Sequence, residues 1–436
     1  MYSKIIQQLN EFRNKISKKK FLFNENIDKF GFDEMKQLIK VKNTSEVKGY
    51  PFLLSKKSGL KCAAKIVPVE LKYDKNEHPS YLEFIMLKFL TENLVDKSVT
   101  PHITYYLGQH KLNNRSKAIK FLNLKKLEVE EKIRSSSNML IAEYVSGGSL
   151  DNWIYNCYEN DIPITKEHWM GVTFQLLYTI HILQDKYKIM HNDFHYGNIL
   201  VDTSIEPGGY FVYTLHGKNY YIPNCGFIPK LWDFEFAMSY SNIIPHSYPN
   251  KFVLGHLSYD KLNHTTIEPS DDEEQDDEPK NVPVQFNKFY DPHYFLTSIL
   301  DLYISQDLFD WIMSLYPSDL IPDDPSKSSS KSSSHTRSHS RSSTRSSLSS
   351  NLSARTNSSR SSPRTSTSTS TQSSYSRHTS DAHKYYLWEG RLVNDIENEF
   401  PELPDSLSLL NSSFFSSLTD IPSDFHESNA IFFKYP

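Results

Sequence analysis

The sequence predicts an α+β protein with two lobes, a small β-rich lobe followed by a larger, mainly helical one, with insertions. Three observations support this class. Two β-prone segments, 50–55 and 61–69, flank a short turn containing Gly59, which predicts a hairpin. Apolar residues at helical spacing follow further along the chain. Two stretches of strongly biased composition then interrupt the globular pattern.

The biased stretches are expected to be insertions. Residues 325–380 contain 27 Ser, seven Arg, two Lys and no acidic residue, so they carry +9 of a chain whose formal net charge is −4. Such a segment buries too little apolar surface to offset chain entropy, and we expect it to be disordered. It could act as a solvated linker, a phosphorylation target, or a weak RNA or protein contact. Residues 268–279 hold eight carboxylates and predict a solvated acidic loop.

The rest of the chain, about 380 residues, is long enough to bury a large core. We expect a helical extension over 1–40, the small lobe over 41–145, the large lobe over 146–324, and its closing part over 381–436, after the Ser/Arg-rich insert.

The cysteines and the apolar runs indicate the compartment. Cys62, Cys157 and Cys225 have neither disulfide nor zinc-site spacing, which favours an intracellular, reducing environment. The amino terminus lacks a signal-peptide core, and no apolar run approaches the roughly 18 residues of a membrane span. We therefore expect no membrane contact.

The individual elements can be placed in order. Pro79 suits the start of a helix, which residues 82–90 continue with apolar side chains at i, i+3, i+4, i+7 and i+8. A second stripe, 169–183, predicts a helix that leads into His191. Strands are expected at 139–145 and 199–201, a hairpin at 211–221, and helices at 289–304 and 308–315.

Oxygen-bearing side chains around His191 suggest chemistry. Asp193 is followed five residues later by Asn198 and then by a strand, and Asp233 follows another apolar run. One carboxylate can accept a proton from a hydroxyl nucleophile, while Asn198 and Asp233 supply the hard oxygen ligands that Mg²⁺ prefers. Lys65 lies inside an apolar strand and needs a partner, which Glu83 on the next helix can provide.

These motifs resemble the protein kinase superfamily. The similarity runs from about residue 40 to 305 and is carried by Ala63-Ala64-Lys65, by His191-x-Asp193-x₄-Asn198 and by Asp233-Phe234-Glu235. The aromatic, Asn- and Lys-rich style and the segment 220–230 are more narrowly similar to serine/threonine-protein kinases of large DNA viruses. Asp291 resembles the buried aspartate that braces the catalytic loop in this family.

The resemblance implies ATP and Mg²⁺ as cofactors, ATP and a protein substrate as partners, and a host cytoplasm or virion as location. It implies a catalytic set made of Asp193, Lys65, Glu83, Asn198 and Asp233. It implies metal ligation by Asn198, Asp233 and Glu235. Nucleotide contacts would come from Val47, Gly49, Ala63, Lys65, Glu143, Val145 and Leu200, with Glu143 and Val145 offering backbone groups to adenine.

Three departures from the family pattern bear on nucleotide binding, on regulation and on the choice of acceptor. The glycine-rich loop over 43–49 keeps only Gly49, which would weaken phosphate binding. Asn192 stands where many protein kinases have Arg, so we expect activity that does not depend on activation-loop phosphorylation. His195 and Glu235 resemble the pattern of aminoglycoside and choline kinases. The hypotheses are a serine/threonine-protein kinase, a small-molecule kinase, and a catalytically idle kinase-like binding protein.

Overall fold

The computed structural model describes residues 2–16, 34–38, 49–56, 59–70, 78–113, 133–241, 243–244, 286–316, 385–388, 391–394 and 403–435. The expected acidic loop 268–279, the Ser/Arg-rich insert 325–380 and Val47 lie outside these residues. No helix in the described ranges combines the length and the apolar character needed to cross a membrane.

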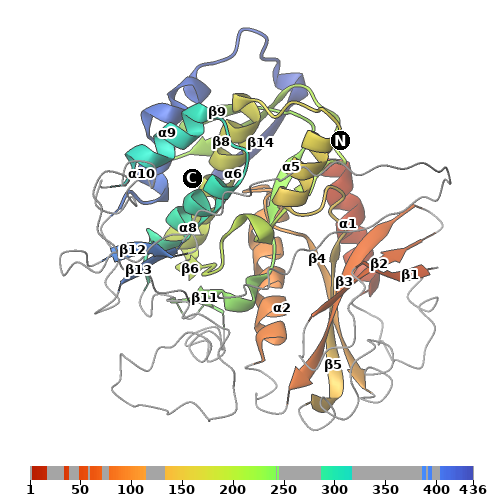
Figure 1. Cartoon of the computed structure of the whole chain (residues 1–436). Coiled ribbons are helices and arrows are strands. Elements are labelled where there is room, and N and C mark those ends of the chain that lie inside the picture. The colour runs from red at the N-terminus through yellow and green to blue at the C-terminus, as the bar shows by residue number, and fades with distance from the viewer. Residues whose placement is uncertain are drawn as a thin grey trace, which may run out of the picture.

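The small lobe is a five-stranded antiparallel sheet with helix α2 beside it (Figure 1). The order is β1-β2-β3-β5-β4, and the β2–β3 hairpin lies where it is expected. The strands are β1 (Glu34–Gln37), β2 (Tyr50–Ser55), β3 (Lys61–Glu70), β4 (Tyr106–Asn113) and β5 (Ile133–Glu143). Strand β5 is longer than the expected 139–145 because both β3 and β4 pair with it.

Helix α2 (Pro79–Leu90) carries the apolar stripe predicted for it. Pro79 occupies its first turn, and the ring of His78 accepts a hydrogen bond from the amide of Ser80 at 3.3 Å. A π-helical turn, η2 (Thr91–Val95), extends it. This start of the helix directs the Glu83 carboxylate into the interior, where none of its side chain is exposed.

The amino-terminal segment is only partly helical. Helix α1 (Tyr2–Ile16) packs against the small lobe through Leu9 and Phe12, and Arg13 pairs with Asp96 at 2.9 Å. Residues 34–37, expected to be helical, instead form the edge strand β1 beside β2. Pairing satisfies backbone groups that β2 would otherwise expose, and this outweighs the weak local helix propensity.

The large lobe surrounds helix α6 (Lys166–Tyr187), most of whose residues are buried. Thr165 and His168 cap its start reciprocally. Helix α8 (Tyr290–Ser298) ends earlier than expected and tightens into η6 (Ile299–Asp301). There the Thr297 and Ser298 hydroxyls donate back to helix carbonyls, which disfavours continuation. The other helices are α5 (Leu150–Glu159), α9 (Gln306–Ser314), α10 (Ser406–Leu410), η7 (Ser413–Thr419) and η8 (Glu427–Asn429).

Short strand pairs hold the loops between the lobes. Strand β6 (Ile189–Met190) pairs with β11 (Met238–Ser239), and β7 (Ile199–Asp202) pairs with β10 (Ile228–Leu231). The loop that carries Asp193 lies between β6 and β7 and ends in the short helix η3 (Tyr196–Asn198). Asp233 follows β10 and precedes η4 (Phe234–Phe236).

A three-stranded sheet closes the large lobe. The expected hairpin is β8 (Tyr210–Leu215) with β9 (Lys218–Pro223), and β14 (Ala430–Tyr435) pairs parallel to β8. Phe433 of β14 is buried and contacts Tyr213 and Tyr2. A separate hairpin joins β12 (Tyr385–Trp388) to β13 (Arg391–Asn394).

Candidate phosphoryl-transfer site

Asp193 and Asn198 face each other across the loop between β6 and β7. The Asn198 amide nitrogen, Nδ2, donates to the Asp193 carboxylate at 2.8 Å and to the Asp193 carbonyl at 2.9 Å. Both side chains are largely buried. The contact fixes the Asp193 carboxylate and leaves Asn198 Oδ1 as the atom available to a metal ion.

Asp291 fixes the backbone at the start of this loop. Its two carboxylate oxygens accept the backbone N–H groups of His191 and Asn192, each at 2.8 Å, and Asp291 itself is fully buried. The bracing role expected for Asp291 is therefore confirmed. Charge-assisted hydrogen bonds of this kind are about twice as strong as neutral ones, so the loop geometry is well determined.

His191 is a scaffold residue. Its ring is buried and donates from Nε2 to the Trp232 carbonyl at 3.0 Å, and it packs on Phe234 with ring centroids 4.8 Å apart. Burial lowers the pKa of His191, which keeps the ring neutral. His191 thereby joins the Asp193 loop to the segment that carries Asp233.

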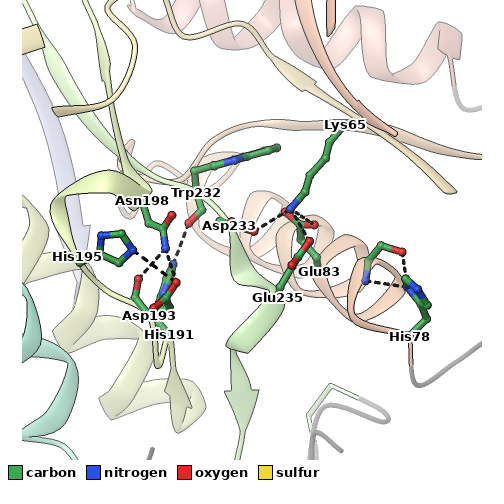
Figure 2. Close-up of polar contacts among 11 residues, drawn as sticks. Lys65, His78, Glu83, His191, Asp193, His195, Asn198, Trp232, Asp233 and Glu235 are labelled. Atoms are coloured by element: carbon green, nitrogen blue, oxygen red, sulfur yellow. Dashed lines mark hydrogen bonds and ion pairs between the residues drawn. The ribbon is translucent and has the colours of Figure 1, made fainter. Parts of the chain in front are cut away.

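Lys65 brings three carboxylates together. Its Nζ lies 3.2 Å from Glu83, 2.9 Å from Asp233 and 2.5 Å from Glu235 (Figure 2). These groups come from β3, α2 and the turn after β10. The Lys65–Glu83 pair expected from the sequence is present, and Glu235 is drawn into the same cluster.

Burial and charge set the protonation of this cluster. Burial alone would lower the pKa of Lys65, but Asp233, Glu235 and Glu83 together raise it well above its ordinary value. Burial also raises the pKa of Glu83 and Glu235, against the opposing effect of Lys65. One ammonium group facing three carboxylates leaves an excess of negative charge in a partly enclosed site.

That excess fits a divalent cation. Oxygen atoms of Glu83, Asp233 and Glu235 lie within 4.8 Å of one another, and hard carboxylate oxygens suit Mg²⁺. Figure 2 shows Asp233 on the side of the Lys65 cluster that faces the Asp193–Asn198 pair. The carboxylates of Asp233 and Glu235 therefore fit a metal ion, and ligation by Asn198 remains a prediction.

The two unusual loop residues have defined contacts. Asn192 adopts a left-handed backbone conformation with φ of 63°, and its Nδ2 donates to the Phe236 carbonyl at 2.9 Å. His195 Nδ1 accepts the Gly197 N–H at 3.1 Å, so the ring proton resides on Nε2, which lies 3.6 Å from Asp193 Oδ2. Asn192 thus ties the Asp193 loop to the Asp233 segment, and His195 directs a donor toward Asp193.

The residues predicted to contact nucleotide flank the end of β5. Ala63 lies opposite Ala142 in the antiparallel register, and Leu200 forms a bridge with Ser149 just after the Glu143–Val145 segment. A Cβ atom placed on Gly49 would lie 2.5 Å from Lys65 Cε, so a side chain at this position would require the Lys65 side chain to shift. The residues predicted to contact nucleotide therefore lie around the end of β5.

Glu143 also has a side-chain role that the sequence reasoning missed. Its carboxylate lies in the interior of the protein. It accepts hydrogen bonds from the Lys230 ammonium at 2.6 Å and from the Tyr105 N–H at 2.7 Å. Burial raises the pKa of Glu143, and Lys230 opposes that effect. The available signal was Lys230 itself, a single charge within the apolar run 227–232.

Comparisons with known proteins agree with this geometry. No family model matches the chain. It is 25% identical over 272 residues to "Putative serine/threonine-protein kinase R400" of Acanthamoeba polyphaga mimivirus, a match that spans 56% of this chain and 52% of the relative. It is 34% identical over 102 residues to "Probable serine/threonine-protein kinase 380R" of Invertebrate iridescent virus 6, covering 22% of this chain and 19% of that protein. The chain thus matches about half the length of the first relative and less of the second.

Among solved structures, the crystal structure of the BubR1 kinase domain matches 54% of this chain and 60% of that chain. The sequence identity is 16% and the TM-score 0.32, too low for this neighbour to support a conclusion. The curated relatives and the site geometry place the chain in a relationship with protein kinases.

Proposed function

From this relationship to protein kinases, we propose that the chain uses ATP and Mg²⁺ to phosphorylate hydroxyl groups, with serine and threonine side chains of proteins as acceptors. One observation carries the proposal. The Lys65–Glu83 ion pair, Asp233 and the Asp193–Asn198 pair occur together in one site, as phosphoryl transfer of this type requires.

Asp193 is the group that would act on the acceptor. Its carboxylate is held by Asn198 and by a loop fixed on Asp291, so it can orient a hydroxyl group and accept its proton. Lys65, oriented by Glu83, would hold the α- and β-phosphates in place of its present contacts with Asp233 and Glu235. Positioning and electrostatics would then supply most of the rate.

Asn198, Asp233 and Glu235 would hold Mg²⁺, which neutralises phosphate charge when bound. Glu235 occupies a position where protein kinases have glycine. Its carboxylate already lies within the cluster around Lys65. Its proposed role as an additional metal ligand rests on that contact.

Two contacts favour a second candidate, a kinase acting on a small hydroxylated molecule. His195 directs Nε2 toward Asp193, and Glu235 adds negative charge to the metal side of the site. Both features resemble aminoglycoside and choline kinases. A catalytically idle binding protein is less well supported, because it would not need the complete set of Lys65, Glu83, Asp193, Asn198 and Asp233.

The cellular setting stays part of the proposal. Cys62, Cys157 and Cys225 are all free thiols, as expected for an intracellular, reducing compartment. The expected RNA or protein contact through residues 325–380 concerns residues outside the described ranges and remains a prediction.

Labelled ATP separates these functions. The purified chain is incubated with Mg²⁺ and γ-labelled ATP, with basic proteins in one series and with aminoglycosides or choline in another. Asp193→Ala and Asp233→Ala serve as matched variants. We expect label in protein that both substitutions abolish. Label only in small molecules would favour the second candidate, and ATP binding without transfer would favour the idle protein.

A further inference from the structure

Three tyrosines lie exposed on one side of the large lobe. Tyr155 and Tyr158 on α5 are 60% and 65% exposed, and Tyr303, in the segment between η6 and α9, is 77% exposed. Large aromatic side chains are costly to leave in water, so a cluster of them on the surface commonly marks a contact site. We call these three residues the tyrosine surface.

Two members of this surface form a stack. The rings of Tyr158 and Tyr303 are 5.6 Å apart between centroids and nearly parallel, at 6°. Each ring therefore covers part of one face of the other, while both residues stay largely exposed. Open tyrosine faces attract cations through the quadrupole of the ring.

The surroundings of the stack are acidic. Residues 144–165 and 299–310, which supply the tyrosines and their flanks, contain six carboxylates and no Lys, Arg or His; these are Asp151, Glu159, Asp161, Asp301, Asp307 and Asp310. Glu159 lies one turn after Tyr155, and its negative charge raises the pKa of the Tyr155 hydroxyl. Asp307 is neutralised by Lys166 at 2.5 Å. Glu159 at the end of α5 and Asp161 just after it are both exposed, and with the tyrosines they make a surface that is both aromatic and negative.

This combination selects among partners. A second copy of the chain, docked face to face, would bring two sets of carboxylates together, which opposes association. A purely apolar partner would leave those carboxylates unpaired. A cationic peptide satisfies both features, and arginine suits them better than lysine because the planar guanidinium stacks on a ring and pairs with carboxylates in a fork.

We propose that the tyrosine surface binds an arginine-rich peptide segment of a partner protein. Helix α5 packs against the catalytic-loop helix η3 and strand β7, so a segment bound here would lie on the element that adjoins the catalytic loop. Peptide binding at this surface does not require phosphoryl transfer.

Fluorescence anisotropy with the full chain tests this proposal. The probe is a labelled 12-residue peptide of alternating Arg and Gly, compared with versions carrying Lys or Glu in place of Arg. We expect binding in the order Arg, then Lys, with none for Glu, and weaker binding as salt is added. Tyr158→Ser and Tyr303→Ser should each weaken binding about three- to fivefold, and Glu159→Lys should weaken it as well.

Matched substitutions elsewhere control for general effects. Ile421 is 69% exposed and Glu427 is exposed, both on the segment before β14, so Ile421→Ser and Glu427→Lys should leave binding unchanged. All the substituted side chains are exposed, and unfolding curves are expected to match the parent chain. Equal peptide affinity in the tyrosine variants and the parent would overturn the proposal. Failure of the full chain to bind the Arg peptide would do so too.

Discussion

Lys230 and Glu143 form an ion pair inside the protein, with Nζ 2.6 Å from Oε1 and almost no exposed surface on either side chain. Lys230 lies on β10, three residues before Asp233, and Glu143 ends β5 at the segment expected to contact adenine. The pair therefore connects the strand that leads to Asp233 with the end of β5.

Removing one partner of this pair should be costly. Lys230→Met leaves the Glu143 carboxylate buried without its cation, and we expect the free energy of unfolding to fall by about 3–5 kcal/mol. Adding Glu143→Gln should recover most of that loss, because Gln is neutral and still accepts the Tyr105 N–H. Denaturant unfolding measures both. Equal stability of the single and double variants would show that the unpaired Glu143 charge is not the cause of the lost stability.

Asp291 should control the geometry of the catalytic loop. Asp291→Ala removes the acceptor of two backbone N–H groups, each bond to a charged group being worth about 1.5–3 kcal/mol. We expect lower stability and a lower transfer rate together. Asp291→Asn keeps one acceptor oxygen and should give an intermediate loss. Thermal unfolding and initial rates are measured in parallel, and parent-like behaviour of both variants would disprove the bracing role.

The contact between Asn192 and the Phe236 carbonyl offers a way to fix the Asp233 segment without a phosphorylated residue. Asn192→Gly keeps the left-handed backbone but loses this hydrogen bond, so we expect the transfer rate to fall about three- to tenfold, the equivalent of one neutral bond. Phosphatase treatment of the parent chain should leave its rate unchanged. A rate that falls on phosphatase treatment would contradict this account.

Much of this arrangement could be predicted from local pattern. The stripe after Pro79 predicted α2, and the β-prone segments around Gly59 predicted the β2–β3 hairpin. Motif spacing predicted the pairing of Lys65 with Glu83 and placed Asp193 and Asn198 in one site. These features depend on short-range periodicity or on a resemblance carried by a few residues.

Other features depend on distant parts of the chain. Strand β14 pairs with β8 across more than two hundred residues, and Lys230 meets Glu143 across 87. No local pattern shows which strand edge a distant strand will pair with, or which buried charge will meet another. These contacts form only when distant segments pack together in the folded core. The strand at 34–37 was missed for the same reason, since β2 provides its pairing partner.

Two buried histidines should make the protein sensitive to acid. Burial lowers the pKa of His102 to about 3 and that of His293 to about 4. Between those values and the ordinary value near 6.5, the unfolded chain binds protons that the folded chain does not, so stability falls as pH falls. Each histidine should cost about 2 kcal/mol at pH 5 relative to pH 8. Denaturant unfolding at several pH values measures this effect. The free energy of unfolding should fall less steeply with falling pH in His102→Gln and in His293→Gln than in the parent chain. An unchanged slope would contradict the assignment.

We propose that the Asp193 carboxylate accepts the proton of the acceptor hydroxyl. Asn is nearly isosteric and its side-chain oxygen can still accept the Asn198 amide, so Asp193→Asn should fold like the parent chain. The most direct measurement is the initial rate of label transfer from ATP with Mg²⁺ in the parent and in this variant, with unfolding curves recorded for both. We predict a fall in rate of roughly 10²- to 10⁴-fold at unchanged stability. A variant that retains the parent rate within about twofold would contradict the account, since a retained rate leaves no role for the Asp193 carboxylate in proton transfer.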